Sequence, residues 1–177
     1  TGMETDSPKQ VVPSLGLVKA AIQGGTLLRV DRRAKIILLF LNDGKILAVH
    51  LKLTGRLLVR KKGAPKDEWQ HVTLSLRNDR GADLELRFCD ARKFGWVRLL
   101  SDLSHLGDLG EFGPEPFDED FTVDYLQKIF SKTNKPVKVV MMDQQKIAGI
   151  GNIYANDAFF LAKVDPRRPS KQLNNSA

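Results

Sequence analysis

The chain has 177 residues, of which 42% are apolar, and a formal net charge of +7, so it can form one good hydrophobic core or two small ones. No apolar run approaches the roughly 18 residues of a membrane span, and the first residues lack the apolar stretch of a signal peptide. We therefore expect a cytoplasmic protein without a membrane partner. Cys89 is the only cysteine, which excludes an internal disulfide and a cysteine-based zinc site.

The charge is distributed as two basic blocks that flank an acidic one. Residues 1–100 contain 19 Lys and Arg against 10 Asp and Glu, residues 101–134 contain 2 against 8, and residues 135–177 contain 7 against 3. This distribution favours a polyanionic partner, although lysines that only keep the surface soluble would give the same balance.

The first hundred residues show one short helix and then many strands. Residues 14–23 fit a helix that ends at Gly24-Gly25. Apolar or alternating segments predict strands over residues 26–31, 35–41, 45–53, 55–60, 71–76, 83–88 and 96–100. Turn residues separate several of them, and so many short strands predict a sandwich or a barrel.

Helical patterns follow residue 100, after a turn-rich acidic segment over 109–116. Val123, Leu126, Ile129 and Phe130 mark one amphipathic helix. Pro136 suits the first turn of a second helix, and a third begins at Asn152. The boundary between a β domain and a helical domain therefore lies within residues 101–120, and a cleft between these two basic domains would suit a polymer.

The stretch GIGNIYANDAF (149–159) predicts a tight loop that leads into a helix. Gly149 and Gly151 permit positive φ or close backbone approach, and Asn152 is a favoured N-cap. Ile153, Ala158 and Phe160 are candidates for the apolar face of the helix. Free N–H groups at its start would suit a phosphate, but a purely structural junction explains these residues equally well.

Lys35 and His50 are candidate polar site residues next to apolar strands. Lys35 directly precedes an apolar run, so partial desolvation could lower its pKa and fit it for proton transfer; charges that merely flank a strand end are the alternative. His50 alternates with Lys52 and Thr54 on one face of a predicted strand, where a structural histidine is the alternative.

The segment Asp90-Ala-Arg-Lys-Phe-Gly-Trp96 places cations and aromatic rings in a turn between strands. Arg92 and Phe94 together could enter a base stack, or they could serve an Arg–Asp tie with aromatic packing. The histidines have no metal-ligand spacing, so we expect no metal and no cofactor in this chain.

Taken together and in order, several segments resemble the formamidopyrimidine-DNA glycosylase and endonuclease VIII family of base-excision repair enzymes. The matching stretches are RRAK (32–35), HLKLTGR (50–56), RFCDARKFG (87–95), LGEFGPEP (109–116) and MDQQKIAGIGNIYANDAFFLAKVDPRRP (142–169). The resemblance implies an α+β fold, in which an N-terminal β-sandwich domain precedes a helical domain with part of a helix-two-turns-helix motif. We accordingly divide the chain into a leader or tag-like segment (1–17), the sandwich (18–103), an acidic connector (104–120) and the helical DNA-binding domain (121–177).

The resemblance also implies a role for each matching residue. Lys35 corresponds to the lysine that assists strand elimination. The residues implied to bind DNA are His50, His71, Arg92, Lys135, Gly151 and Asn152. Leu53, Arg92 and Phe94 would fill the gap left by a flipped base. Trp69 stands where some members have a DNA-contacting histidine, so that contact is not expected here.

Two features of the family have no match in the chain, namely the N-terminal catalytic proline with its glutamate and the C-terminal zinc finger. We therefore interpret the chain as an internal fragment or a reduced relative, inactive alone, whose parent would bind zinc. The resemblance implies a monomeric parent that binds double-stranded DNA containing oxidised bases or abasic sites. Such a protein would be cytoplasmic, and associated with the nucleoid if it is bacterial. It would excise oxidised purines such as formamidopyrimidine and 8-oxoguanine and nick the strand by elimination. A non-catalytic DNA-binding remnant and an unrelated anion-binding sandwich are the alternatives.

Overall fold

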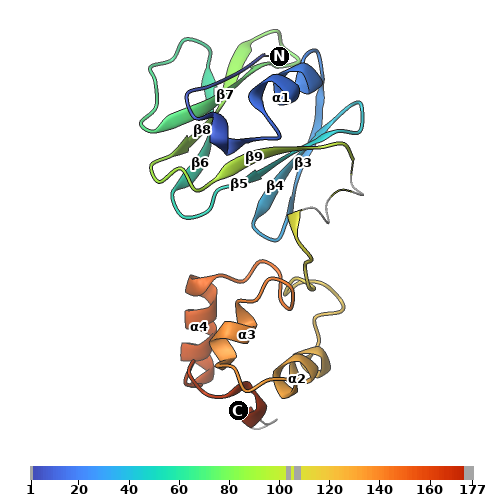
Figure 1. The fold of residues 1–177 in the computed structure, drawn as a ribbon, viewed down its shortest axis with the longest axis vertical. Helices are drawn as coiled ribbons and strands as arrows, with labels where there is room; N and C mark the ends of the chain where they lie inside the picture. Colours follow the sequence, from blue (N-terminus) through green and yellow to red (C-terminus); the bar gives the residue numbers. More distant parts are fainter. Residues whose placement is uncertain (1, 103–104, 106–108, 174–177) are drawn as a thin grey trace. The chain divides into compact units, whose positions relative to one another are not determined.

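The computed structural model describes residues 2–102, 105 and 109–173 and divides the chain into two compact units, Thr1–Leu106 and Gly107–Ala177 (Figure 1). Each unit is described by itself. The first is built mainly of strands and the second of helices, which confirms the predicted α+β fold class. The expectation of one cleft shared by both units stays a prediction.

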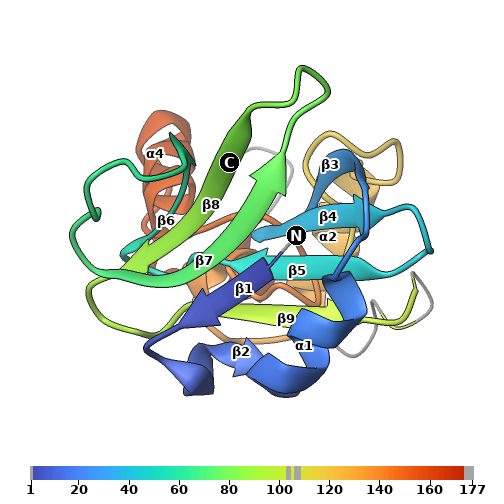
Figure 2. The same ribbon diagram turned by 90° about the horizontal axis from the view of Figure 1, so that it is seen from above.

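The first unit is a sandwich of two sheets (Figure 2). One sheet has the order β1-β7-β8-β6 and the other the order β2-β9-β5-β4-β3. Neighbouring strands are antiparallel except β2 and β9, which are parallel. The strands are β1 (Gly2–Thr5), β2 (Val11–Val12), β3 (Leu27–Arg33), β4 (Ile36–Leu41), β5 (Ile46–His50), β6 (Gly55–Lys61), β7 (Gln70–Arg77), β8 (Asp83–Asp90) and β9 (Trp96–Leu100).

The core of this unit lies between the sheets, because alternate side chains of each strand point inward. Val49, Val72 and Phe88 are buried there, together with Val18 and Ile22 of helix α1 (Leu15–Ile22). The helix begins where the sequence predicts, since the Ser14 hydroxyl accepts a hydrogen bond from the Leu17 N–H at 3.3 Å.

Residues 2–12 belong to the sandwich, and their assignment to a leader is wrong. Strand β1 pairs with β7 in a register that sets Met3 opposite Leu74, and Met3 is only 1% exposed. Strand β2 pairs with β9, and Val11 is buried in the same core. Strands of four and two residues are too short to show a period in the sequence, so pattern analysis missed them.

Two segments that were predicted as parts of strands lie in loops. Strand β5 ends at His50, because Lys52 takes a positive φ of 53° and the Gly55 N–H donates to the Leu51 carbonyl, which turns the chain into β6. Lys52 and Thr54 therefore do not continue a strand face with His50. Lys35 lies outside β4, in the short turn that follows Ala34, whose φ is 52°.

The second unit contains the helices α2 (Val123–Ser131), α3 (Val137–Met141) and α4 (Asn152–Ala162), and the short 3₁₀ helix η3 (Ser170–Gln172). Helix α2 lies where predicted, and the Thr122 hydroxyl caps it. The core of the unit is formed by Ile129, Val137, Val140, Ile147, Ile150, Ala155 and Phe159.

Part of the predicted connector belongs to this unit. The Gly113 N–H donates to the Gln144 carbonyl, and the Ala148 N–H donates to the Pro114 carbonyl, each at 3.0 Å. A Cβ on Gly113 would collide with the Lys146 carbonyl, so a side chain would not fit there. Residues 113–114 are thus a fixed part of the helical unit. Residues 104 and 106–108 of the connector, and residue 103 at the end of the predicted sandwich, lie outside the described residues.

Candidate functional site

The turn between β8 and β9 is organised by Asp90, which is 1% exposed. Its carboxylate accepts hydrogen bonds from the Gly95 N–H at 2.7 Å, from the Arg92 N–H at 3.3 Å and from the Thr54 hydroxyl. Burial raises the pKa of Asp90, but these hydrogen bonds outweigh it and hold the pKa below its ordinary value. An ionised carboxylate therefore fixes both ends of this turn.

The anchored turn presents Arg92 and Phe94 to solvent. The Arg92 guanidinium lies 4.8 Å from the centre of the Phe94 ring, and Phe94 is 55% exposed. Leu53, on the neighbouring β5–β6 loop, is 73% exposed. Large apolar side chains held in the open by a rigid turn suit insertion into another molecule.

His50 lies beside two cationic side chains of the first unit, Lys35 and Lys52. Burial and the charges of Lys52 and Lys35 lower the pKa of His50 to about 4. Its Nδ1 accepts a hydrogen bond from the Lys52 N–H at 2.9 Å. The imidazole is therefore neutral at pH 7 with its proton on Nε2, which is a hydrogen-bond donor suited to a phosphate.

Lys35 fulfils the expectation of a lowered pKa. Partial burial of its ammonium group is the main cause, and the positive charge of Lys52 adds to it, although the residue as a whole is exposed. A lysine of lowered pKa releases its proton more readily than an ordinary lysine, so this position can support proton transfer.

His71 is placed differently from the other predicted DNA ligands. It is 8% exposed, and its Nδ1 lies 2.8 Å from the Asp6 carboxylate. Its Nε2 is buried and has no hydrogen-bond partner among the described residues. The imidazole is thus tied to the N-terminal segment, and its DNA contact stays a prediction. Trp69, two residues earlier, is 51% exposed.

In the second unit, Gln144 holds the loop that precedes α4, a role that sequence reasoning missed. Its amide donates to the Met142 carbonyl at 2.9 Å and to the Ile150 carbonyl at 2.8 Å, and accepts from the Gly149 N–H at 3.0 Å. Gly149 has a φ of 89°, a conformation that favours glycine. Gly151 has an extended φ of −118° and does not need this freedom.

The N-cap of α4 is Gly151, not Asn152 as predicted. Asn152 is the first helical residue and is exposed. Because glycine has no side chain, the cap makes no side-chain hydrogen bond, which leaves the first N–H groups of α4 for another acceptor.

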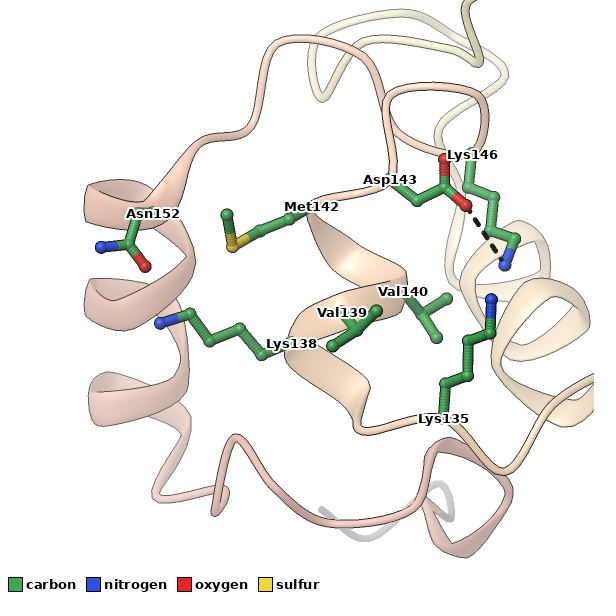
Figure 3. A pocket seen from close by; sticks show the side chains of 8 residues that line it. All are labelled: Lys135, Lys138, Val139, Val140, Met142, Asp143, Lys146 and Asn152. Carbon is green, nitrogen blue, oxygen red and sulfur yellow. Dashed lines mark ion pairs between the residues drawn. The ribbon is translucent and has the colours of Figure 1, made fainter. Parts of the chain in front are cut away.

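Asn152 borders an open hollow of about 470 Å³ on the second unit (Figure 3). Lys135, Lys138, Lys146 and Asn152 line it, and Asp143 is the acidic residue of the lining. Lys146 pairs with Asp143 at 3.5 Å. Three ammonium groups against one carboxylate give this hollow a positive charge that suits an anion. Lys138 and Lys146 were not predicted, because a lysine on an isolated segment gives no sign of its partners.

The predicted apolar face of α4 is wrong. Ile153 and Phe160 are 74% and 83% exposed, whereas Ala155 and Phe159 are buried. Apolar residues occur on all sides of this helix, so their spacing does not identify the packed face.

No group of three or more His, Cys, Asp and Glu side chains that could hold a metal occurs in residues 2–102, 105 and 109–173. Cys89 is buried in the sandwich, so the implied zinc ion has no fitting ligand set in this part of the chain. No described helix is long and apolar enough to cross a membrane.

The first unit is a β-sandwich, and the second is helical with a glycine-rich loop before α4. This combination is typical of proteins in which a β-sandwich precedes a helix-two-turns-helix domain. The sequence profile of the formamidopyrimidine-DNA glycosylase N-terminal domain matches residues 1–97, and that of the family's H2TH domain matches residues 112–177. The chain belongs to the formamidopyrimidine-DNA glycosylase family. The first match includes the residues that had been assigned to a leader.

Curated relatives carry the same name. The formamidopyrimidine-DNA glycosylase of Herpetosiphon aurantiacus is 39% identical over 173 residues, which is 97% of this chain and 59% of that protein. The protein of Chloroflexus aurantiacus is 41% identical over 175 residues, which is 98% of this chain and 61% of that protein. The chain thus spans about three-fifths of the length of these relatives.

Solved structures share the fold. The Fpg protein of Lactococcus lactis, in complex with DNA that contains an abasic site, is 29% identical with a TM-score of 0.89 and covers 99% of this chain and 64% of its own. A MutM protein in complex with DNA containing carbocyclic 8-oxo-G is 27% identical with a TM-score of 0.88 and covers 99% of this chain and 65% of its own.

Proposed function

We propose that this chain binds double-stranded DNA containing oxidised bases or abasic sites, as part of a monomeric base-excision DNA glycosylase and abasic-site lyase. The observation that carries the proposal is the turn over residues 90–95. Asp90 fixes its backbone from inside the protein, while Arg92 and Phe94 project into solvent. The DNA complexes of the related Fpg and MutM proteins support the choice of ligand.

The two units would contribute different phosphate contacts. In the first, the His50 Nε2–H and the Lys35 ammonium group are assigned to phosphates near the damaged nucleotide. In the second, Lys135, Asn152 and the first N–H groups of α4, which have no side-chain cap, are assigned to the backbone of the same duplex. Such contacts fix the position of DNA without reading its sequence.

The exposed turn would probe the base pair. Flipping a nucleotide out of the stack costs a few kcal/mol, and an inserted side chain can offset part of this cost. We assign that insertion to Phe94 and Leu53, and the contact with the orphaned base to Arg92, whose planar guanidinium can both stack and donate hydrogen bonds.

The reaction of the whole protein is proposed from its membership in the formamidopyrimidine-DNA glycosylase family. It would excise oxidised purines such as formamidopyrimidine and 8-oxoguanine and nick the strand by elimination. Lys35 would assist the elimination, for which its lowered pKa is suitable.

Binding tests this proposal directly. In equilibrium titrations, the chain is expected to bind a duplex containing an abasic site more tightly than the matched intact duplex. Equal affinity for the two duplexes would contradict it. Borohydride reduction then separates an enzyme from a binding protein without chemistry. A covalent adduct with abasic DNA requires a reactive amine, whereas preferential binding without an adduct supports the non-catalytic alternative.

A further inference from the structure

We propose that Gln10 is a positioning residue for the probing turn. The N-terminal segment would thereby hold Phe94 and Arg92 in position for insertion into DNA, which rests on the proposed function. Gln10 ends the short 3₁₀ helix η1 (Pro8–Gln10) and is 3% exposed.

The Gln10 amide reaches both ends of the turn, although Gln10 is 80 residues from Asp90 and 85 from Gly95 along the chain. Its Nε2 donates to the Gly95 carbonyl at 3.0 Å and lies 3.5 Å from the Asp90 carboxylate. Arg92 and Phe94 lie between these two anchored points. Because both contacts are acceptors, only the amide nitrogen can face them, which fixes the orientation of the side chain.

The other atom of the amide group, Oε1, indicates that Gln10 is present for the hydrogen bonds that its Nε2 donates. Gln10 Oε1 is buried and has no hydrogen-bond partner among the described residues. A buried unpaired acceptor is unfavourable, so packing alone would favour an apolar side chain at this position. The hydrogen bonds that Nε2 donates offset the unfavourable burial of Oε1.

The end of the turn that Gln10 holds is tightly packed. A Cβ on Gly95 would lie 2.5 Å from Phe88 Cζ and 2.7 Å from the His50 carbonyl oxygen. The chain at Gly95 therefore has one position against the sandwich, and Gln10 fixes the direction of its carbonyl group. Loss of that bond leaves the Gly95 carbonyl buried without this donor and lets the turn change its orientation.

The test compares Gln10→Met with Gln23→Met. Methionine keeps a long unbranched side chain and removes the donor, and Gln23 is an exposed residue at the end of α1. Affinities for matched abasic and intact duplexes are measured, with 2-aminopurine opposite the abasic site to report on the orphaned base. We expect Q10M to lower the preference for abasic DNA by roughly 2- to 10-fold, as for a lost hydrogen bond to a charged network. The affinity of Q10M for intact DNA should equal that of wild type. Q23M should keep the wild-type affinity for both duplexes.

Phe94→Ala separates the possible failures. If wild type shows no preference for abasic DNA, or F94A keeps that preference, the proposed function fails. If F94A loses the preference but Q10M retains it, only the role of Gln10 is overturned. If Gln10 acts through Phe94, the Q10M/F94A double variant should lose no more preference than F94A alone.

A measurement on the unaltered protein covers the case in which Q10M does not fold. The N–H groups of Gly95 and Arg92 are bonded to Asp90 inside the turn. Their hydrogen exchange should be as slow as that of β8, because the turn is held as one piece with the sheet. Fast exchange at both positions would overturn the proposal.

Discussion

His50 shows how a single residue combines burial with a surface task. Its neutral imidazole avoids adding a further charge beside Lys35 and Lys52, and its Nε2–H remains as a donor. A group whose pKa falls on folding binds protons less readily in the folded state than in the unfolded state. Stability must therefore fall as the pH is lowered from the unfolded pKa of 6.5 toward the folded value of about 4.

We predict that His50→Gln flattens this pH dependence. The shift corresponds to at most about 3 kcal/mol, and solvent screening of a half-buried group reduces it. Urea unfolding of both proteins at several pH values between 7 and 4.5 measures the effect. Carboxylates of lowered pKa, such as Asp90, begin to lose their stabilising contribution near about pH 5, but they do so in both proteins and therefore cancel in the comparison. Equal pH dependence in both proteins would show that His50 is not the titrating group.

The sequence identified the residues that face outward and missed those that hold them. Lys35, His50, Arg92 and Phe94 stand in recognisable segments. Gln10 and Gln144 act through contacts with backbone groups that only the fold brings near. The residue type gives no sign of such a contact, because a glutamine in a loop is most often just hydrated.

At the scale of the element, the loop before α4 depends on Gly149. We predict that Gly149→Ala destabilises the second unit by about 1 kcal/mol or more, because alanine is strained at a φ of 89°. Gly16→Ala is the matched control. Gly16 lies in α1 with no atom within 4 Å of a built Cβ, so alanine should leave stability unchanged or raise it. Thermal unfolding of both variants measures the difference, and an equal effect at both sites would refute the argument.

Elements were predictable where their period was long enough to be seen. Strands β7 and β8 contain the alternating segments 71–76 and 83–88, and α2 has a clear apolar stripe. Strands β1 and β2 are too short for this test and depend on pairing with distant strands. Helix α4 was found by its glycine-rich start, but its packed face was not, because both its buried and exposed sides are apolar.

At the scale of the whole molecule, the net charge of +7 supports DNA binding that weakens as salt concentration rises. We predict that Lys138→Ala lowers the salt dependence by about 0.9 log units of affinity per log unit of salt, the value for one phosphate contact on duplex DNA. Lys163→Ala, at the far end of α4, is the control and should keep the wild-type slope. If both substitutions change the salt dependence of the affinity equally, the hollow in Figure 3 does not bind a DNA phosphate in preference to the rest of the surface.

In the proposed function, Asn152 holds the DNA backbone whereas Phe94 probes the duplex for damage. One set of equilibrium titrations tests this most directly, with wild type, Phe94→Ala and Asn152→Ala on matched intact and abasic duplexes. Phe94→Ala should reduce the preference for abasic DNA and spare binding to intact DNA, whereas Asn152→Ala should weaken both by a similar factor. The claim is contradicted if Phe94→Ala weakens both duplexes equally or if Asn152→Ala changes neither.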